Sequence, residues 1–294
     1  MVKPDRKLFG LIGHPLGHTF SPALHHFVLQ RIEVEGCYHA LDTPAAELSA
    51  VIEGMRALGF AGFNVTVPYK QAVLKCLDER DPTVEEVGAV NTVRFRDGRL
   101  LGYNTDVVGF ARALEQAGVQ ARGKVALVLG AGGAARAVVV ALIRAGVARI
   151  VLHNRTVSRA EELAEHARTK LDFAAVEVST AVADLPFPEF DLVINATSVG
   201  MCPHTQARPL EFREAMLRTT VMDLVYNPIE TAFLHEARAA GARTLDGLDM
   251  FIFQGLEALR IWLDREVDVQ PPDVRKFLIQ RLRCHEPDSI SHSG

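Results

Sequence analysis

Short apolar runs alternate with segments of helical periodicity along most of this chain. In its first third, the pattern predicts strands at residues 8–13, 37–41 and 60–66 and helices at residues 22–30 and 45–58. Ser21 and Pro22 favour a helix start, because serine can cap free backbone N–H groups and proline fits the first helical position. Strands and helices that alternate in this way are typical of a compact α/β unit.

A hairpin is predicted where Asp97-Gly98 separates two further apolar runs, residues 90–96 and 100–103. The tight turn of a hairpin needs positive φ angles, which glycine accepts at no steric cost. The first unit is therefore expected to contain a mixed sheet.

A predicted helix at residues 106–117, ended by Gly118, carries the chain into a second unit. The alternation continues there, with strands expected at residues 124–129, 149–153, 174–178, 192–195 and 221–225 and helices at 138–144, 157–168 and 231–240. This pattern predicts a sheet covered by helices. Two last helices are expected at residues 250–264 and 272–283, before a polar tail, residues 285–294, expected to be disordered.

Length and composition are those of a globular protein with two domains. A chain of 294 residues exceeds what one hydrophobic core usually organises. Hydrophobic residues make up 48% and charged residues 23%, which is ordinary for such a protein. The formal net charge is −4 and no dense block of lysine and arginine occurs, so nucleic acid is not an expected partner.

Membrane insertion and export are not expected either. The most hydrophobic tract, residues 125–146, is interrupted by Arg136 and by glycines. The charged N-terminus lacks the apolar core of a signal peptide. The four cysteines are scattered and form no Cys-x-x-Cys motif, which fits reduced thiols in a cytosol better than a disulfide framework or a zinc site. The sequence therefore predicts a cytoplasmic protein.

The segment that begins at Gly130 carries a glycine pattern between a predicted strand and a predicted helix. In a dinucleotide site, the first glycine permits the tight turn, the next lets the backbone approach a pyrophosphate, and the helix directs its N–H groups at the anion. We interpret this segment as such a turn, formed by Gly130, Ala131, Gly132, Gly133 and Ala134. The alternative is a tightly packed turn without a ligand.

The end of the next strand distinguishes between the two nicotinamide cofactors. An NAD site places a carboxylate there to bind the ribose hydroxyls. This chain instead has Asn154-Arg155-Thr156 followed by Arg159, with no carboxylate until Glu161. A guanidinium suits an additional phosphate, so NADP is predicted over NAD. The alternative is that Arg155 and Arg159 form a solvated helix face.

Lys70 and Asp106 are the candidate acid–base pair. Lys70 lies in Asn64-Val65-Thr66-Val67-Pro68-Tyr69-Lys70, just past a strand end, and Asp106 lies at a predicted helix start. Reduction of a ketone needs a proton donor within hydrogen-bonding reach of its oxygen, and a lysine in a cleft can serve. A surface ion pair without chemistry is the alternative.

Four histidines near the N-terminus, His14, His18, His25 and His26, lack the spacing of a zinc site and bring no nearby carboxylate. No metal is predicted.

Met201 and Met250 are interpreted as core residues.

Several segments, taken in order, resemble the motifs of shikimate dehydrogenases. They are His18-Thr19-Phe20-Ser21-Pro22, residues 64–70, Gly88-Ala89-Val90-Asn91-Thr92, Gly102-Tyr103-Asn104-Thr105-Asp106, residues 130–137, Asn154-Arg155-Thr156, Asn195-Ala196-Thr197-Ser198-Val199-Gly200-Met201 and Asp223-Leu224-Val225-Tyr226. The match extends from residue 8 to about residue 280.

This resemblance implies an oxidoreductase of aromatic amino-acid and chorismate biosynthesis that reversibly reduces 3-dehydroshikimate to shikimate with NADPH. It implies a substrate-binding domain of residues 1–105 and 249–284 and a Rossmann-like NADP-binding domain of residues 106–248. Lys70 would transfer the proton, with Asp106 as its partner. The other implied residues are Thr19, Ser21, Thr66, Asn91, Tyr226 and Gln254 for substrate and the glycine turn, Asn154, Arg155, Thr156, Arg159, Thr197, Val225 and Gly247 for cofactor.

Two departures from the family pattern keep alternatives open. Thr19 stands where the family usually has serine, and its added methyl group could alter the balance between shikimate and quinate. A quinate/shikimate dehydrogenase of broader range, including one that uses NAD, is therefore an alternative. A catalytically silent NADP- or shikimate-sensing regulator is another, although the retained Lys70 and Asp106 argue against it. The role of His26, where the family often has asparagine, and the choice between monomer and homodimer do not follow from the sequence.

Overall fold

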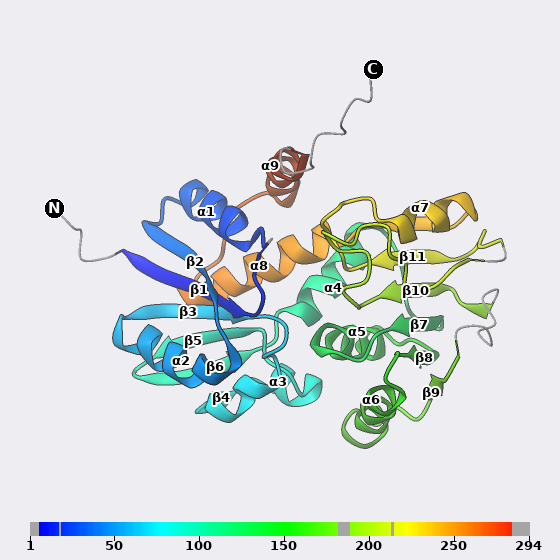
Figure 1. Cartoon of the computed structure of the whole chain (residues 1–294), viewed down its shortest axis with the longest axis horizontal. Coiled ribbons are helices and arrows are strands. Elements are labelled where there is room, and N and C mark those ends of the chain that lie inside the picture. Colours follow the sequence, from blue (N-terminus) through cyan, green and yellow to red (C-terminus); the bar gives the residue numbers. More distant parts are fainter. Residues whose placement is uncertain (1–5, 18, 182–188, 213–214, 284–294) are drawn as a thin grey trace.

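The computed structural model describes residues 6–17, 19–181, 189–212 and 215–283, whose strands form two six-stranded sheets (Figure 1). The predicted tail at residues 285–294 lies outside these ranges. The strand order is β2-β1-β3-β5-β6-β4 in the first sheet and β12-β11-β10-β7-β8-β9 in the second. Strands β1–β6, which come first in the chain, form the first sheet, and strands β7–β12 form the second.

The first sheet is mixed, as predicted. β5 pairs antiparallel with β3 and β6, and the remaining pairs are parallel. At the hairpin, Asp97 and Gly98 have φ angles of 50° and 77°, as a turn with two left-handed residues requires. The strands are β1 (Lys7–Gly13), β2 (Gly36–Asp42), β3 (Phe60–Val65), β4 (Glu79–Arg80), β5 (Thr92–Arg96) and β6 (Arg99–Tyr103).

Helix α1, the first helix beside this sheet, begins at Ser21 without the serine cap that the sequence predicted. Ser21 is already helical and its side chain caps nothing. Instead, Thr19 Oγ1 accepts the backbone N–H of Ser21 at 3.2 Å, so the expected serine cap is wrong. The helical segments are α1 (Ser21–Arg31), η1 (Ala45–Glu47), α2 (Leu48–Ala57), η2 (Ala72–Cys76) and α3 (Pro82–Val87).

The second sheet is parallel throughout and doubly wound. From the central β7 the chain moves outward to β8 and β9, and then returns to the other side of β7 to form β10. The order therefore reverses between β7 and β10, which is where such sheets bind ligands. The strands are β7 (Val125–Leu129), β8 (Arg149–His153), β9 (Val176–Ser179), β10 (Leu192–Asn195), β11 (Thr220–Asp223) and β12 (Arg243–Leu245).

Helix α5 begins at Gly133, five residues before its predicted start at residue 138. Ala134, Ala135 and Ala137 are strong helix formers, so the glycine turn is shorter than the glycine pattern indicated. The helices on this sheet are α4 (Asp106–Gln116), α5 (Gly133–Arg144), α6 (Val157–Lys170) and α7 (Ala232–Ala239).

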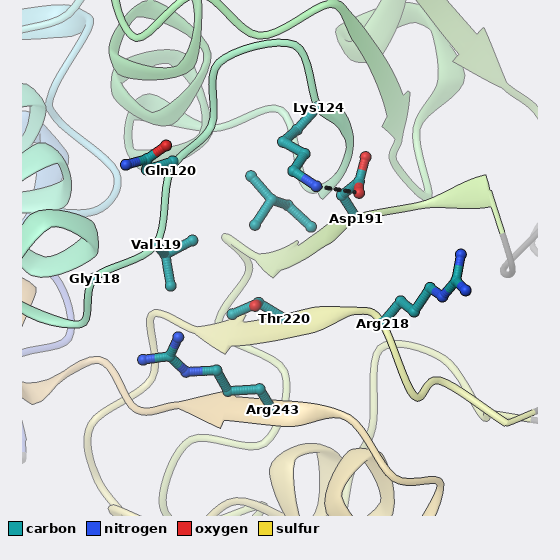
Figure 2. Close-up of a pocket in the computed structure, with 9 residues that line it drawn as sticks. Gly118, Val119, Gln120, Lys124, Asp191, Arg218, Thr220 and Arg243 are labelled. Atoms are coloured by element: carbon teal, nitrogen blue, oxygen red, sulfur yellow. Dashed lines mark hydrogen bonds and ion pairs between the residues drawn. The ribbon is translucent and has the colours of Figure 1, made fainter.

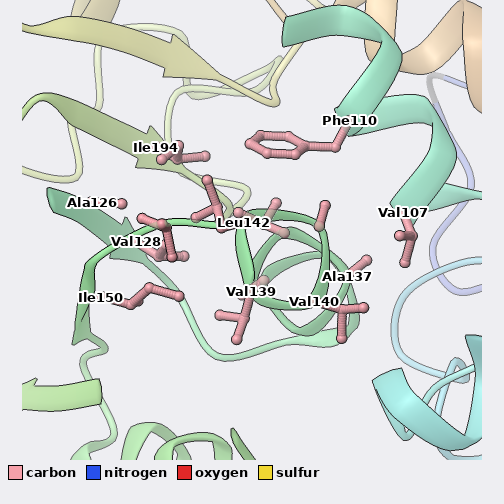
Figure 3. Close-up of a cluster of buried hydrophobic side chains, with 14 of the residues drawn as sticks. Val107, Phe110, Ala126, Val128, Ala137, Val139, Val140, Leu142, Ile150 and Ile194 are labelled. Carbon is pink, nitrogen blue, oxygen red and sulfur yellow. The ribbon is translucent and has the colours of Figure 1, made fainter. Parts of the chain in front are cut away.

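Helices α4 and α5 cover one face of the second sheet. Figure 3 shows Leu142 of α5 and Phe110 of α4 beside Val128 and Ile194 of the strands, and all four side chains are almost fully buried. This packing holds α4 and α5 against each other and against the sheet.

Helices α8 (Leu248–Leu263) and α9 (Pro271–Arg283) return to the first sheet. Figure 1 shows α8 running beside α4 and on toward β1. The Trp262 indole N–H donates to the Val93 carbonyl oxygen at 2.9 Å, and its ring stacks on Phe9. None of the helices in the described ranges has the length and hydrophobicity that a membrane-spanning helix needs.

Candidate active site

Lys70 and Asp106 form an ion pair where the two sheets meet. Lys70 Nζ lies 2.5 Å from Asp106 Oδ2, and the two side chains are only 15% and 8% exposed. Lys70 follows the turn after β3, and Asp106 is the first residue of α4. A pair with so little exposure differs from the solvated surface pairs that contribute little to stability. The structure thus brings the predicted acid–base residues together.

Asn91 fixes the other oxygen of the Asp106 carboxylate. Its Nδ2 donates to Asp106 Oδ1 at 2.8 Å and to Thr105 Oγ1 at 2.9 Å, while its Oδ1 accepts the Thr105 backbone N–H at 2.8 Å. Both amide hydrogens of Asn91 are therefore engaged by the protein. A direct contact of Asn91 with substrate stays a prediction.

A buried polar chain behind Asn91 had not been assigned a role from the sequence. Tyr38 donates its hydroxyl to Asn64 Oδ1 at 2.8 Å, and Asn64 Nδ2 donates to Thr92 Oγ1 at 2.9 Å. Thr92 in turn donates to Asn91 Oδ1 at 3.1 Å. Burial raises the pKa of Tyr38 well above its usual value, so its proton stays in this chain of hydrogen bonds. A polar Asn64 within an apolar strand run was the sequence signal for it.

Thr19, Ser21 and Tyr226 gather at one side of this network. Thr19 Oγ1 lies 3.2 Å from Ser21 Oγ. Burial raises the pKa of Tyr226 to about 12, and hydrogen bonding with the Phe20 backbone and the Thr19 side chain opposes that shift in part. The Tyr226 ring stacks on Phe251 of α8, with centroids 4.2 Å apart. Hydroxyl groups from α1, from the segment after β11 and from β2 thus face one region.

Gln254 and Thr66 are less directly tied to the ion pair. Gln254 lies on α8 where that helix crosses α4, and its Nε2 donates to the Phe251 carbonyl oxygen at 2.8 Å. Thr66 follows β3, and its methyl group packs against Gly13. In the described part of the chain, no hydrogen bond joins either side chain to Lys70 or Asp106.

The glycine turn lies at the reversal point of the second sheet and touches the ion pair. Gly130 has a φ of 113°, which favours glycine, and a Cβ there would lie 3.0 Å from the Ala196 carbonyl oxygen. A Cβ on Gly133 would lie 2.8 Å from Lys70 Cδ. The predicted cofactor turn therefore packs against the aliphatic part of the predicted acid–base lysine.

The turn also has the features that a pyrophosphate requires. No atom lies within 4 Å of a Cβ built on Gly132, so the backbone there is open to a ligand. Helix α5 starts without a side-chain cap, which leaves its first N–H groups available to an anion. These residues fit a dinucleotide.

Arg155 and Arg159 are exposed at the start of α6, and neither makes an ion pair with a described carboxylate. Asn154 Nδ2 donates to the Thr156 carbonyl oxygen at 2.8 Å and shapes the turn between β8 and the helix. Thr156 stands at the N-cap position, but its hydroxyl caps nothing. Two guanidinium groups beside a free helix N-terminus are suited to an anion.

The predicted residues of the nicotinamide side all follow strands of the second sheet at its carboxyl edge. Thr197 follows β10, Val225 follows β11 and Gly247 follows β12. Thr197 Cγ2 would lie 3.1 Å from a Cβ on Gly130, and Gly247 packs against the Leu224 carbonyl oxygen. The strand ends thus bring these residues to the same edge as the glycine turn.

A separate cavity of about 310 Å³ lies at the opposite edge of this sheet (Figure 2). Lys124 and Asp191, which precede β7 and β10, form an ion pair there at 2.8 Å. Figure 2 shows Arg218 and Arg243 pointing away from each other, so they do not converge on one group. The amino edge of a parallel sheet is not where such folds bind cofactors.

Two of the N-terminal histidines, His25 and His26, pack against or hydrogen-bond to β2. His25 is buried and stacks on Tyr38 with centroids 4.1 Å apart, and burial lowers its pKa to about 3, so it is uncharged. His26 Nε2 accepts the Tyr38 backbone N–H at 2.9 Å, which ties α1 to β2. His18 lies outside the described ranges. Within those ranges, no group of three or more metal-ligating side chains is assembled.

The two methionines interpreted as core residues differ in their exposure. Met250 is buried at 6% exposure, whereas Met201 is 47% exposed. The core interpretation of Met201 is therefore wrong. Met201 comes directly after Gly200, whose φ of 92° turns the chain outward at the carboxyl edge.

Two family descriptions match the chain. Residues 11–93 match "Shikimate dehydrogenase substrate binding domain", and residues 112–224 match "Shikimate / quinate 5-dehydrogenase". A Bacillus cereus (strain B4264) protein named "Shikimate dehydrogenase (NADP(+))" is 40% identical over 278 residues, covering 94% of this chain and 99% of its own.

Two solved structures extend the comparison. The shikimate 5-dehydrogenase of Thermus thermophilus, in complex with NADP(H) and shikimate, is 39% identical and superposes with a TM-score of 0.81 over 94% of this chain and 99% of its own. The 5-ketofructose reductase of Gluconobacter sp. strain CHM43 is 35% identical, with a TM-score of 0.82 over 95% and 98%. Identity and coverage of this extent, on two sheets joined by a buried Lys–Asp pair, show that the chain belongs to the shikimate dehydrogenase family.

Proposed function

We propose that this protein catalyses the reversible, NADP-dependent reduction of 3-dehydroshikimate to shikimate. The observation that carries the proposal is the buried ion pair of Lys70 and Asp106 in contact with Gly133 of the cofactor turn. That contact is made by the aliphatic stem of Lys70, so it supports a site in which the lysine lies next to a cofactor bound at the glycine turn. It joins acid–base chemistry and the dinucleotide turn in one site.

Lys70 would give a proton to the carbonyl oxygen of the substrate as that oxygen gains negative charge. NADPH, when bound, supplies the hydride. Asp106 would hold the lysine side chain in place and accept a hydrogen bond from a substrate hydroxyl. Asn91 would keep the Asp106 carboxylate oriented. In the reverse direction, the neutral amine of Lys70 would take the proton of the alcohol.

Thr19 and Ser21 would bind the substrate carboxylate. Their hydroxyl groups are close together at the start of α1, where the helix dipole also favours an anion. Tyr226, stacked on Phe251, and Gln254 would close this side of the site, and Thr66 and Asn91 would hydrogen-bond the ring hydroxyls.

Arg155 and Arg159 would bind the 2′-phosphate that distinguishes NADP from NAD. Their exposure and their lack of a described carboxylate partner support this role, because both guanidinium groups remain open to a phosphate. Asn154 and Thr156 would shape the same pocket. Thr197, Val225 and Gly247 would line the nicotinamide.

The division into domains and the setting of the protein are parts of the same proposal. Residues 1–105 and 249–284 would form the substrate-binding domain, and residues 106–248 would form the NADP-binding domain. The return of α8 to the first sheet through Trp262 supports these bounds. We propose a cytoplasmic enzyme that acts as a monomer or homodimer on a small-molecule substrate.

The test measures oxidation of shikimate and of quinate, each with NADP and with NAD, for the wild type, Lys70→Ala and Lys75→Ala. Lys75 is an exposed lysine on the same segment and serves as the control. Lys70→Ala should lower kcat with shikimate about 10²–10⁴-fold, the usual contribution of a positioned acid–base group, while Lys75→Ala should not. Equal kcat values for the two variants would remove Lys70 from the mechanism.

A broader substrate range is the second candidate function. Thr19 adds a methyl group beside the carboxylate site, and a 35% identical structure bears the name 5-ketofructose reductase. The same assays therefore also measure the reduction of 5-ketofructose. A higher kcat/KM with quinate or 5-ketofructose than with the shikimate pair would make the broader function the correct one.

A further inference from the structure

Asp223 is a buried carboxylate that has no part in the roles described above. It ends β11 at the carboxyl edge of the second sheet and is 0% exposed. Asn195 Nδ2 donates to its Oδ1 at 2.8 Å, the Val225 backbone N–H donates to the same oxygen at 3.0 Å, and the Thr231 hydroxyl donates to Oδ2 at 2.7 Å. All three donors are uncharged. Burying a carboxylate without a cation costs free energy, so its presence at this place calls for a reason.

The first arm of this network leads through Asn195 to Thr197. Asn195 is 0% exposed, and its Oδ1 accepts both the Thr197 backbone N–H at 3.1 Å and the Thr197 hydroxyl at 2.7 Å. Because a carboxylate only accepts hydrogen bonds, the Asn195 NH₂ group must face Asp223 and its oxygen must face Thr197. Asp223 therefore determines the orientation of the Asn195 amide and, through it, the direction of the Thr197 hydroxyl.

The second arm leads directly to the backbone of Val225. One carboxylate oxygen thus joins the last residue of β10 to the segment after β11. The segment after β10 lies beside the glycine turn, since Thr197 is in contact range of a Cβ on Gly130. The third donor, Thr231, also accepts the Leu234 N–H and so caps α7, which anchors the other carboxylate oxygen to the body of the sheet.

We propose that Asp223 is a positioning residue for the nicotinamide end of the cofactor, acting through Asn195 on Thr197 and directly on the Val225 backbone. This inference rests on the proposed function, in which Thr197 and Val225 line the nicotinamide. It goes further in assigning to one buried carboxylate the directions of the Thr197 hydroxyl and of the Val225 N–H, beyond the backbone hydrogen bond from the Leu224 N–H to the Asn195 carbonyl oxygen that already joins the two strand ends. Such a residue should affect hydride transfer while leaving the adenosine end of the cofactor site unchanged.

The experiment compares Asp223→Leu, Asp223→Asn and Thr231→Val. Leucine removes both acceptors, whereas asparagine keeps the oxygen that serves Asn195 and Val225 and turns its NH₂ group toward Thr231. Valine at position 231 removes the Oδ2 donor and the cap of α7 but leaves both arms intact. It is therefore the control for a general loss of stability. Circular dichroism establishes that each variant is folded.

Two readouts separate the ends of the cofactor. Asp223→Leu should lower kcat/KM for NADPH about 10–100-fold, as expected for a misplacement of about 1 Å, and should leave the inhibition constant of adenosine 2′,5′-bisphosphate unchanged. Asp223→Asn and Thr231→Val should keep most of the wild-type kcat/KM. A folded Asp223→Leu variant with wild-type kinetics would overturn the proposal, and so would equal losses for NADPH and for the bisphosphate.

If the leucine variant does not fold, Asn195→Ala tests whether Asp223 acts through Asn195 on Thr197. It breaks the first arm while the carboxylate keeps its other two donors, and the same two readouts apply to it. Failure of the proposed function would be visible elsewhere, in a Lys70→Ala variant with unchanged kcat. The two failures are therefore distinguishable.

Discussion

Gly133 and Lys70 touch where the cofactor turn meets the acid–base site. A Cβ on Gly133 would lie 2.8 Å from Lys70 Cδ and 3.0 Å from Lys70 Cβ, distances that leave no room for a methyl group. The absence of a side chain at residue 133 therefore sets where the lysine lies. Glycine patterns of this kind are usually explained by the pyrophosphate alone.

Gly133→Ala should separate stability from activity. Gly133 opens α5, where alanine is the better helix former by about 0.5–1 kcal/mol. The methyl group, however, displaces the stem of Lys70 from Asp106. We expect an unchanged or higher Tm by calorimetry, together with a kcat lowered about tenfold or more.

Gly54→Ala is the matched control for that experiment. Gly54 lies inside α2, and a Cβ there would meet nothing within 4 Å. It should raise Tm and leave kcat as it is. If Gly133→Ala behaves in the same way as Gly54→Ala, the contact with Lys70 has no catalytic consequence.

Arg155→Ala should weaken the binding of NADPH more than that of NADH. Hydrogen bonds to a charged group are worth about 1.5–3 kcal/mol, so KM for NADPH should rise roughly 10–150-fold. NADH has no 2′-phosphate and should be affected little. Steady-state KM values for both cofactors are the measurement.

Lys170→Ala serves as the control for the loss of a surface cation. Lys170 ends the helix that Arg155 precedes, roughly 20 Å away at 1.5 Å per residue. It should change neither KM. Equal effects of Arg155→Ala on the two cofactors would leave the preference for NADP without its proposed cause.

Asp223 should make stability depend on pH in the opposite sense to most carboxylates. Burial raises its pKa from 3.8 to about 6, so between these two values the folded protein holds a proton that the unfolded chain does not. Its contribution to stability therefore grows as the pH falls through 6 and is lost as the pH rises. Relative to Asp223→Asn, the wild type should gain roughly 1 kcal/mol between pH 7 and pH 5.

Urea denaturation of both proteins across that pH range measures this difference. Taking the difference between the two proteins cancels the carboxylates that they share. A difference that stays constant from pH 7 to pH 5, or that changes in the other direction, would show that Asp223 titrates near its ordinary value when folded.

Trp262→Phe should destabilise the first sheet without altering the cofactor site. The indole N–H donates to the Val93 carbonyl oxygen at a buried position, and phenylalanine removes that hydrogen bond at a cost of about 0.5–1.5 kcal/mol. The free energy of unfolding should fall by that amount, while KM for NADPH should not change. A large increase in KM for NADPH would contradict the separate roles of the two sheets.

The sequence predicted those features that depend on local pattern. The strand that precedes Lys70 and the helix that begins at Asp106 were both recognisable from apolar periodicity, although nothing in the periodicity places the two side chains 2.5 Å apart. Strands β4 and β12 were missed because they are short, and β12 begins with a charged residue. Short elements are held by their neighbours in the sheet, and single-sequence patterns do not record neighbours.

Hydrogen-bond partners were the least predictable part of the site. Ser21 looked like a helix cap, but the adjacent hydroxyl of Thr19 accepts its N–H instead. Asp223 and Asn195 lie within recognisable motifs but were given no role, because a polar residue at a strand end looks the same in sequence whether it is buried or solvated. The exposure of Met201 likewise depends on the outward turn at Gly200. Burial and pairing are properties of the assembled fold.

The bond between Trp262 and Val93 also bears on the order in which the nascent chain can mature. It spans 169 residues, so the first sheet lacks its covering helix until nearly the whole polypeptide has left the ribosome. The second sheet, completed by β12 at residue 245, has all of its strands earlier. During synthesis, the first sheet, residues 7–103, therefore keeps an uncovered apolar face until α8 has emerged, and we expect chaperones to bind the nascent chain in this interval.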